Sequence, residues 1–370
     1  MPSQMQNLGQ QNIAVYEDIT NEVKRNFIIL ESYIRSDGAI EYKLSMVEDT
    51  KEKFLELHSS LRKRNYIPIL RKDGVSLTLY VAPFEHKKKY SIKIALALFG
   101  ATIVSLLVDG WLRASSPFDQ KIFPESNPVF VTLSYALAFI GILGLHELGH
   151  LLIARRHRMA STMPYFIPGI PGTGVPTFGA VIFATEPMPN RDIQFDVGLF
   201  GPISGFVVAI VVGLFGVLTS VVLPLGEFNK LFGPNQGTFT DIPLLMNLML
   251  IAVGKVSISE EAVVILSPLA YAAWFGLLIT FLNTLPAWQL DGGHMARSVL
   301  SERQQRIATI LSALVMAFFG FFLMALLVLF FSYGQNSVRP LDEISPLSRS
   351  RKIVFALMIF VVILCAPLPI

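Results

Sequence analysis

The sequence predicts an α-helical polytopic membrane protein, with about six transmembrane helices and a small N-terminal α+β domain in the cytosol. Of its 370 residues, 52% are hydrophobic and 15% are charged, whereas a soluble domain has about 25% charged residues. The mean hydropathy is +0.55, and apolar runs recur with the roughly 20 residues that a bilayer crossing needs. The net charge of +3 does not indicate nucleic acid binding, and the basic clusters are typical of loops beside membrane spans.

Residues 13–88 have the pattern of a soluble ββαββ domain. Each pair of strands flanks a turn signal, which is Ser36-Asp37-Gly38 in the first hairpin and Asp73-Gly74 in the second. Residues 48–64, between the hairpins, carry apolar side chains at helical spacing. The expected strands cover residues 27–34, 39–46, 66–70 and 75–81.

Residues 89–370 are expected to form the transmembrane domain. Six apolar runs have spanning length, and they cover residues 90–112, 129–154, 195–223, 262–286, 306–332 and 353–369. A shorter apolar run at 242–254 is expected to be re-entrant or interfacial. Residues 1–12 are polar, are expected to be flexible, and lack the basic and apolar regions of a signal peptide. We therefore expect the amino terminus to stay in the cytosol.

Lysine and arginine positions predict the orientation, because basic residues gather in cytoplasmic loops. Lys87–Lys89 precede the first span, and Arg155, Arg156 and Arg158 follow the second. Both observations place the N-terminal domain and this end of the second span on the cytoplasmic side of a cell membrane. The basic residues at 349–352 do not fit, because six complete spans would place them outside.

The second span contains HELGH, in which two histidines and a glutamate interrupt an otherwise apolar run. Ionisable groups inside a membrane are costly and usually have a partner there. His146 and His150 are four residues apart, so they project from one helical face, where both imidazoles can bind one Zn²⁺. Glu147 lies beside them and can act as general base on a metal-bound water. The pattern predicts one zinc ion, and the alternative is a pair of hydrogen-bonded histidines.

Asp291 is the expected third ligand, since a catalytic zinc usually has three protein ligands and one open position. It lies in NTLPAWQLDGGH, which follows the fourth span and falls on the same predicted side as HELGH. The alternative is that Asp291 caps the helix that follows it. Glu260 and Glu261 are weaker candidates, because they open the fourth span at the opposite face.

The two motifs together resemble those of the site-2 proteases, the intramembrane zinc metalloproteases, over residues 129–297. The shared patterns are HExxH in one membrane helix and NxxPxxxLDG near the end of a later one. The resemblance implies zinc binding by both histidines of HELGH and by Asp291, and activation of water by Glu147. It also implies that Asn283 helps to bind the substrate or the oxyanion.

Two further segments, residues 172–180 and 189–205, are similar to the branch that contains plant chloroplast homologues and their archaeal or bacterial relatives. This branch has no inserted PDZ domain. A site inside the bilayer boundary implies that the substrate is a peptide bond within or next to a transmembrane segment, as in regulated intramembrane proteolysis.

A strand-like run at 178–185 is the expected contact for such a substrate. Unwound backbone in a membrane needs hydrogen-bonding partners, and a substrate added as an extra strand would find them there. The alternative is an ordinary connecting hairpin. The residues expected to bind the substrate are Phe178, Gly179, Ala180, Val181 and Ile182.

Two other functions remain open from the sequence. One is a membrane zinc peptidase with a glutamate third ligand that acts outside the bilayer, for which Glu302 is the available residue. The other is a divalent-metal transporter that uses the intramembrane histidines and aspartate. Cys365 is the sole cysteine, which excludes an internal disulfide and a thiolate metal cluster.

Overall fold

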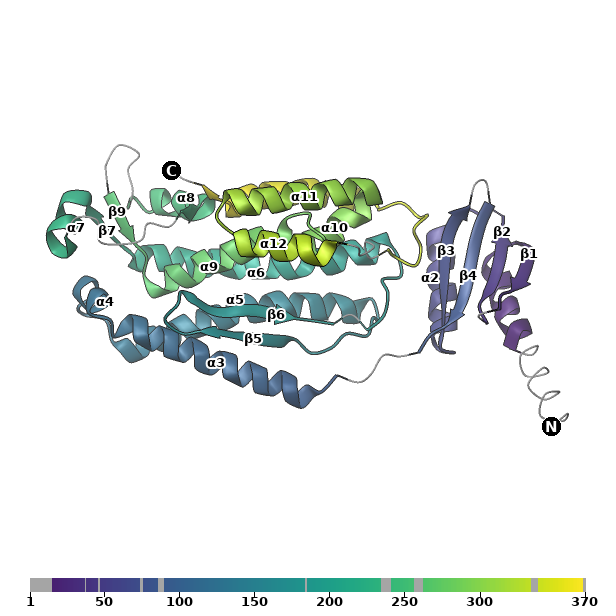
Figure 1. The fold of residues 1–370 in the computed structure, drawn as a ribbon, viewed down its shortest axis with the longest axis horizontal. Coiled ribbons are helices and arrows are strands. Elements are labelled where there is room, and N and C mark those ends of the chain that lie inside the picture. Colours follow the sequence, from purple (N-terminus) through teal and green to yellow (C-terminus); the bar gives the residue numbers. More distant parts are fainter. Residues whose placement is uncertain are drawn as a thin grey trace.

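The computed structural model of the chain describes residues 15–368, except positions 37, 46, 74–75, 86–89, 184, 234–240, 256–261 and 334–338. The molecule is elongated (Figure 1). A four-stranded sheet and its helices form one end, and the longer helices of the rest of the chain run along the long axis.

The sheet at one end contains both predicted hairpins. Its strands are β1 (Ile29–Ile34), β2 (Ile40–Leu44), β3 (Tyr66–Asp73) and β4 (Ser76–Pro83), and α2 (Thr50–Arg62) connects the two hairpins. Neighbouring strands pair antiparallel in the order β1-β2-β4-β3. The helix α2 covers the sheet because Phe54, Leu57 and Leu61 recur at helical spacing and are fully buried.

A further helix over residues 15–26 precedes β1, and the predicted ββαββ pattern did not include it. Ile19, Val23 and Phe27 are buried in the core of this part. Their four-residue spacing is the helical signal in the sequence.

Three helices are long and apolar enough to cross a membrane: α3 (Ile92–Ala114), α5 (Pro128–Arg156) and α6 (Arg191–Thr219). They correspond to the first three predicted spans. The fourth, α9 (Pro268–Thr284), is apolar but has 17 residues. It is shorter than predicted because the start of the expected span forms a strand, β9 (Ala262–Ile265), which pairs with β7 (Val221–Pro224).

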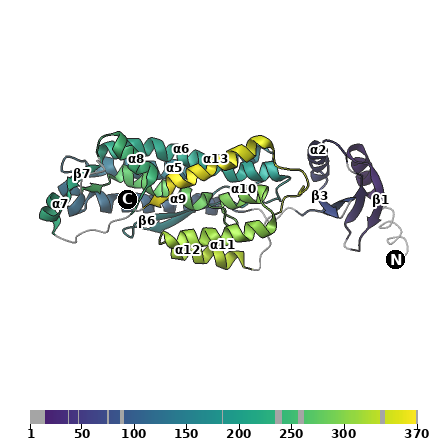
Figure 2. The same ribbon diagram turned by 90° about the horizontal axis from the view of Figure 1, so that it is seen from above.

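The predicted span at 306–332 is wrong, because this run folds into two helices, α11 (Glu302–Phe318) and α12 (Phe322–Ser332). Gly320 adopts a left-handed φ of 82°. The N–H of Phe321 donates to the carbonyl of Met316 at 2.8 Å, which is the pattern of a glycine-terminated helix. The two helices lie side by side in both views (Figures 1 and 2). Both halves are apolar, so hydropathy alone did not reveal the break.

This break also explains the basic residues that did not fit the predicted orientation. Arg351, near the start of α13 (Arg349–Cys365), binds Asp196 on α6 at 2.6 Å. The same carboxylate binds His157, the C-cap of α5, at 3.0 Å. The basic start of α13 therefore lies beside the basic end of α5, since the chain reverses direction within 306–332.

The remaining elements are short. The helix α8 (Leu244–Ala252) has nine residues and is too short to cross a bilayer, which agrees with the predicted marginal run at 242–254. The others are α4 (Pro117–Ile122), β5 (Tyr165–Ile170), β6 (Val175–Val181), α7 (Leu225–Phe232), β8 (Ile242–Pro243), α10 (Asp291–Val299) and β10 (Pro367–Leu368).

Polar contacts join the sheet end to the helical part. Lys51 on α2 binds Asp192 on α6 at 3.1 Å, and Arg62 binds Glu186 at 2.7 Å. The backbone N–H of Leu70 on β3 donates to the carbonyl of Leu341 at 2.9 Å. The sheet end is therefore held by charged and polar groups against the start of α6 and against the segments that precede α6 and α13.

Candidate active site

His146 and His150 on α5 and Asp291 on α10 converge on one point. The Nε2 atoms of the two histidines are 3.2 Å apart. Oδ2 of Asp291 lies 3.2 Å from Nε2 of His146 and 3.3 Å from Nε2 of His150. Among the residues that the structure describes, these three form the group of His, Cys, Asp and Glu side chains placed to hold a metal ion.

This triangle has the size that a tetrahedral zinc site requires. Bonds from Zn²⁺ to nitrogen or oxygen are about 2.0–2.1 Å, so two tetrahedral ligands lie about 3.3 Å apart. The three observed separations are 3.2, 3.2 and 3.3 Å. Two imidazoles and one carboxylate fit zinc, and three ligands leave a fourth position open for water or substrate.

The orientation of His150 is fixed by a second contact. Its Nδ1 lies 2.7 Å from the backbone carbonyl of Val197 on α6. A carbonyl oxygen only accepts, so Nδ1 carries the proton and Nε2 presents its lone pair to the centre of the triangle. Such a contact is typical of metal-binding histidines. The sequence analysis missed Val197, because a backbone carbonyl leaves no residue-type signal.

Glycines on one face of α6 allow His146, His150 and Asp291 to approach this helix. A Cβ added at Gly201 would lie 2.0 Å from Nε2 of His150, and one at Gly205 would lie 3.1 Å from the ring of His146. A Cβ at Gly198 would lie 2.6 Å from the backbone oxygen of Asp291. The spacing of these glycines is the signal that could have identified them, because small residues three or four apart mark close helix contacts in membranes.

We expect a Gly201→Ala variant to bind zinc about 10–100-fold more weakly, the usual cost of disturbing a group that supports a metal ligand. Its added methyl group would overlap the imidazole of His150. Competition with a zinc chelator measures this change. Gly100→Ala on α3 is the matched control, because a Cβ there meets no atom within 4 Å. Equal zinc affinity in the two variants would mean that the imidazole of His150 can move away from the added methyl group without loss of zinc binding.

The side chains of Glu147 and Asn283 lie in the same cavity as the triangle. This cavity has a volume of about 310 Å³. Glu147 is buried, and Asn283 comes from α9. His294 of α10 also lines the cavity.

The end of strand β6 also reaches this cavity. Of the five residues expected to bind the substrate, Ala180, Val181 and Ile182 line it. Phe178 and Gly179 are not among the lining residues, and the side chain of Phe178 is exposed. The strand-like run was predicted to continue to residue 185, but β6 ends at Val181.

Glu302, one of the alternative third ligands, is not in the group that could hold a metal ion with the two histidines. Glu302 forms ion pairs with Arg306 at 3.1 Å and with Arg339. Glu260 and Glu261 lie outside the described residues. The N-cap of α10 is Leu290, and Asp291 is its first helical residue, so the capping alternative for Asp291 is wrong.

Comparison with known proteins identifies the class of this site. The model of Peptidase family M50 matches residues 134–327, which is more than half of the chain and includes HELGH and Asp291. The chain is 28% identical over 239 residues to the probable zinc metalloprotease EGY2, chloroplastic, of Oryza sativa subsp. indica, covering 63% of this chain and 42% of that protein. It is 32% identical over 224 residues to the probable zinc metalloprotease EGY1, chloroplastic, of Arabidopsis thaliana, covering 56% and 40%.

The triangle of two histidines and one aspartate is of the kind that zinc metallopeptidases use, and both relatives are named as probable zinc metalloproteases. The chain belongs to Peptidase family M50, the site-2 protease family, as the two motifs predicted. It spans about two fifths of the length of the curated relatives named above. No solved structure matches it significantly.

Proposed function

We propose that the chain hydrolyses peptide bonds within or next to transmembrane segments of membrane proteins. The observation that carries this proposal is the position of the triangle formed by His146, His150 and Asp291, which we call the ligand triangle. His146 and His150 lie on α5, an apolar helix of spanning length, and His150 is about 9 Å inside its basic end at 1.5 Å per residue. A site at that depth is reached by the backbone of a membrane-embedded substrate.

The residues of the cavity have distinct proposed roles. His146, His150 and Asp291 hold one zinc ion, which when bound lowers the pKa of a water and polarises the scissile carbonyl. Glu147 accepts the proton of the attacking water and passes it to the leaving amine. Asn283 donates a hydrogen bond to the oxyanion or to the substrate backbone.

We also propose that β6 binds unwound substrate as an added strand. Hydrogen bonds hold the β5–β6 hairpin in place along α3. Oγ of Ser105 donates to the carbonyls of Gly169 and Pro176 at 3.1 and 3.0 Å. At the tip, the N–H of Gly172 donates to Asp109 at 2.8 Å. The hairpin is thus fixed against α3, and the end of β6 opens onto the cavity.

We expect a substrate cysteine beside the cleavage site to cross-link to a Val181→Cys variant. The background is Cys365→Ala with Glu147→Gln, so that the substrate stays uncut. Ile170→Cys is the matched control, because Ile170 lies at the far end of the same hairpin and its side chain is more exposed than that of Val181. Disulfide yield on gels is the measurement, and equal yields at both positions would contradict strand addition at β6.

The proposed location is a cell membrane, with the sheet domain (residues 13–88) and the active site facing the cytoplasm. The support is the basic end of α5, where Arg155 and Arg156 close an apolar helix, because such residues gather on the cytoplasmic side.

Proteoliposomes test the function directly. We expect the zinc-loaded chain to cleave a single-span substrate at bonds that mass spectrometry places in or beside its apolar segment. A soluble peptide of the same sequence should be cut much more slowly. Equal cleavage of both would favour a peptidase that acts outside the bilayer, and zinc flux without cleavage would favour a transporter.

A further inference from the structure

A basic cavity lies between the sheet end and the helical part, separate from the ligand triangle. Its volume is about 560 Å³, and we call it the interdomain cavity. The sheet end contributes α2 and the residues after it, and the helical part contributes the end of α5 and the start of α6. Its lining residues are Leu55, His58, Ser59, Arg62, Lys63, Asn65, Arg156, His157, Arg158, Pro189 and Ile193.

Positive charge in this cavity is only partly neutralised. Arg62 binds Glu186 at 2.7 Å, and His157 binds Asp196 at 3.0 Å. Within the described part of the chain, Lys63, Arg156 and Arg158 form no ion pair, and no carboxylate is among the lining residues. Three cations from two parts of the fold therefore face one space without a counter-charge.

The backbone holds these cations together. Arg158 has a left-handed φ of 55°, which is unusual for a residue with a side chain. Nη1 of Arg62 donates to the carbonyl of Arg158 at 2.5 Å, so the end of α2 is tied to the residue that carries one of the free cations. Burial and the nearby Arg62 lower the pKa of His58 to about 4, and its neutral ring adds a hydrogen-bonding group rather than a further charge.

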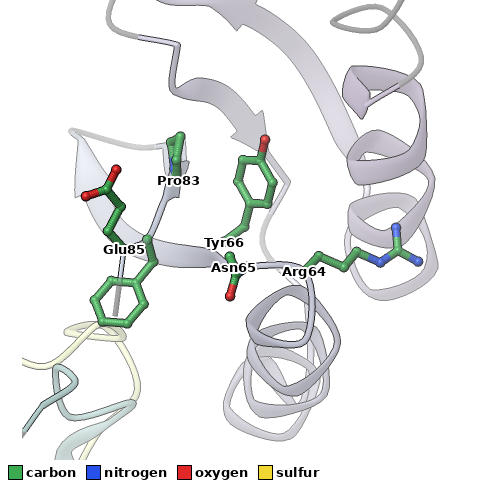
Figure 3. A pocket seen from close by; sticks show the side chains of 6 residues that line it. Arg64, Asn65, Tyr66, Pro83 and Glu85 are labelled. Atoms are coloured by element: carbon green, nitrogen blue, oxygen red, sulfur yellow. The ribbon is translucent and has the colours of Figure 1, made fainter. Parts of the chain in front are cut away.

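A second cavity of similar size also contains a basic residue, but there the positive charge is neutralised (Figure 3). It lies on the sheet end, and its lining includes Arg64 and Glu85. Arg64 is neutralised by Asp18 and Glu22, and in Figure 3 its side chain extends away from Glu85. The positive charge of this second cavity is matched by carboxylates, whereas the interdomain cavity has an excess of positive charge.

We propose that the interdomain cavity binds a phosphate-bearing anion, and that the bound anion joins the sheet end to the basic end of α5. Guanidinium groups match phosphate oxygens in geometry and charge. Arg156 ends an apolar helix of spanning length and Arg158 lies two residues beyond it, so we place the cavity at the level of a membrane surface. The phosphate therefore belongs either to an anionic lipid headgroup or to a soluble phosphate compound.

The test uses the purified full chain and two probes. Pyrophosphate binding is measured by calorimetry in a neutral detergent. Lipid binding is measured by native mass spectrometry after incubation with vesicles of equal parts phosphatidylglycerol and phosphatidylcholine. The cavity variant is Lys63→Gln with Arg156→Gln and Arg158→Gln. The control variant is Lys24→Gln with Arg303→Gln and Arg349→Gln, which removes the same charge from other exposed positions.

We expect the cavity variant to bind its probe roughly 100-fold more weakly, since each cation near a membrane surface contributes several-fold to the affinity for anionic groups. The control variant should bind as the unaltered chain does. If the cavity variant loses pyrophosphate binding, the bound phosphate belongs to a soluble compound. If it loses phosphatidylglycerol binding alone, the phosphate belongs to a lipid headgroup. Lys63→Gln alone should weaken binding of the same probe several-fold. Because Lys63 lies outside the helices, this substitution leaves membrane insertion intact. Equal binding by both triple variants, or no binding of either probe, would overturn the proposal.

Discussion

A Glu147→Gln variant is expected to keep its zinc and to lose about 10²–10⁴-fold in the rate of hydrolysis, the usual contribution of a positioned general base. Glutamine preserves the size of the side chain but cannot accept the proton of the attacking water. Glu147 is not part of the ligand triangle, so metal binding should persist. The measurements are zinc content by mass spectrometry and cleavage of co-expressed membrane substrates, whose uncut forms should accumulate.

Glu227→Gln on α7 is the matched control, because this exposed glutamate is far along the chain from the cavity and does not line it. It should cleave at the normal rate. Normal cleavage by Glu147→Gln would contradict the proposed role of this residue as general base. Loss of zinc from Glu147→Gln would instead show that the variant disturbs the metal site, and Glu147→Asp would then be compared.

The convergence of His146, His150 and Asp291 was predictable because each belongs to a local pattern. His146 and His150 are one helical turn apart, so the spacing alone places both rings on one face. Asp291 was harder, since it lies 145 residues from His146 along the chain. Its prediction used the topology, which places the ends of the second and fourth predicted spans at one face.

The groups that orient these ligands were not predictable from local patterns. The carbonyl of Val197 and the glycine face of α6 act through contact between helices, which depends on how α5, α6 and α10 pack. Proximity of this kind leaves only a weak trace in the sequence. The spacing of Gly198, Gly201 and Gly205 is such a trace, and it becomes interpretable once α6 is known to lie against α5.

Errors in the predicted spans have one physical origin. Hydropathy reports which residues avoid water, but it does not report where the backbone turns. Gly320 turns the chain between two apolar helices, and the strand β9 takes up the start of the fourth expected span. The charged residues contained the missing information, because the basic start of α13 fits the orientation only if 306–332 reverses direction.

An Asp291→Ala variant is expected to lose zinc and activity together. The triangle would retain only His146 and His150, and two imidazoles on one helix leave the metal without the carboxylate that balances its charge. Loss of a direct ligand should cost more than the roughly 100-fold in affinity that loss of an outer partner costs. Zinc content after dialysis against a graded series of chelator concentrations measures the change, with cleavage assayed on the same samples.

Glu302→Ala is the matched control for this experiment. Glu302 binds Arg306 and Arg339 at the start of α11, and its removal should leave both zinc and cleavage unchanged. The reverse result, with zinc lost from Glu302→Ala and kept by Asp291→Ala, would select the peptidase with a glutamate ligand. Because Asp291 lies 3.2 and 3.3 Å from the two imidazole nitrogens, we expect the aspartate variant to be the one that loses the metal.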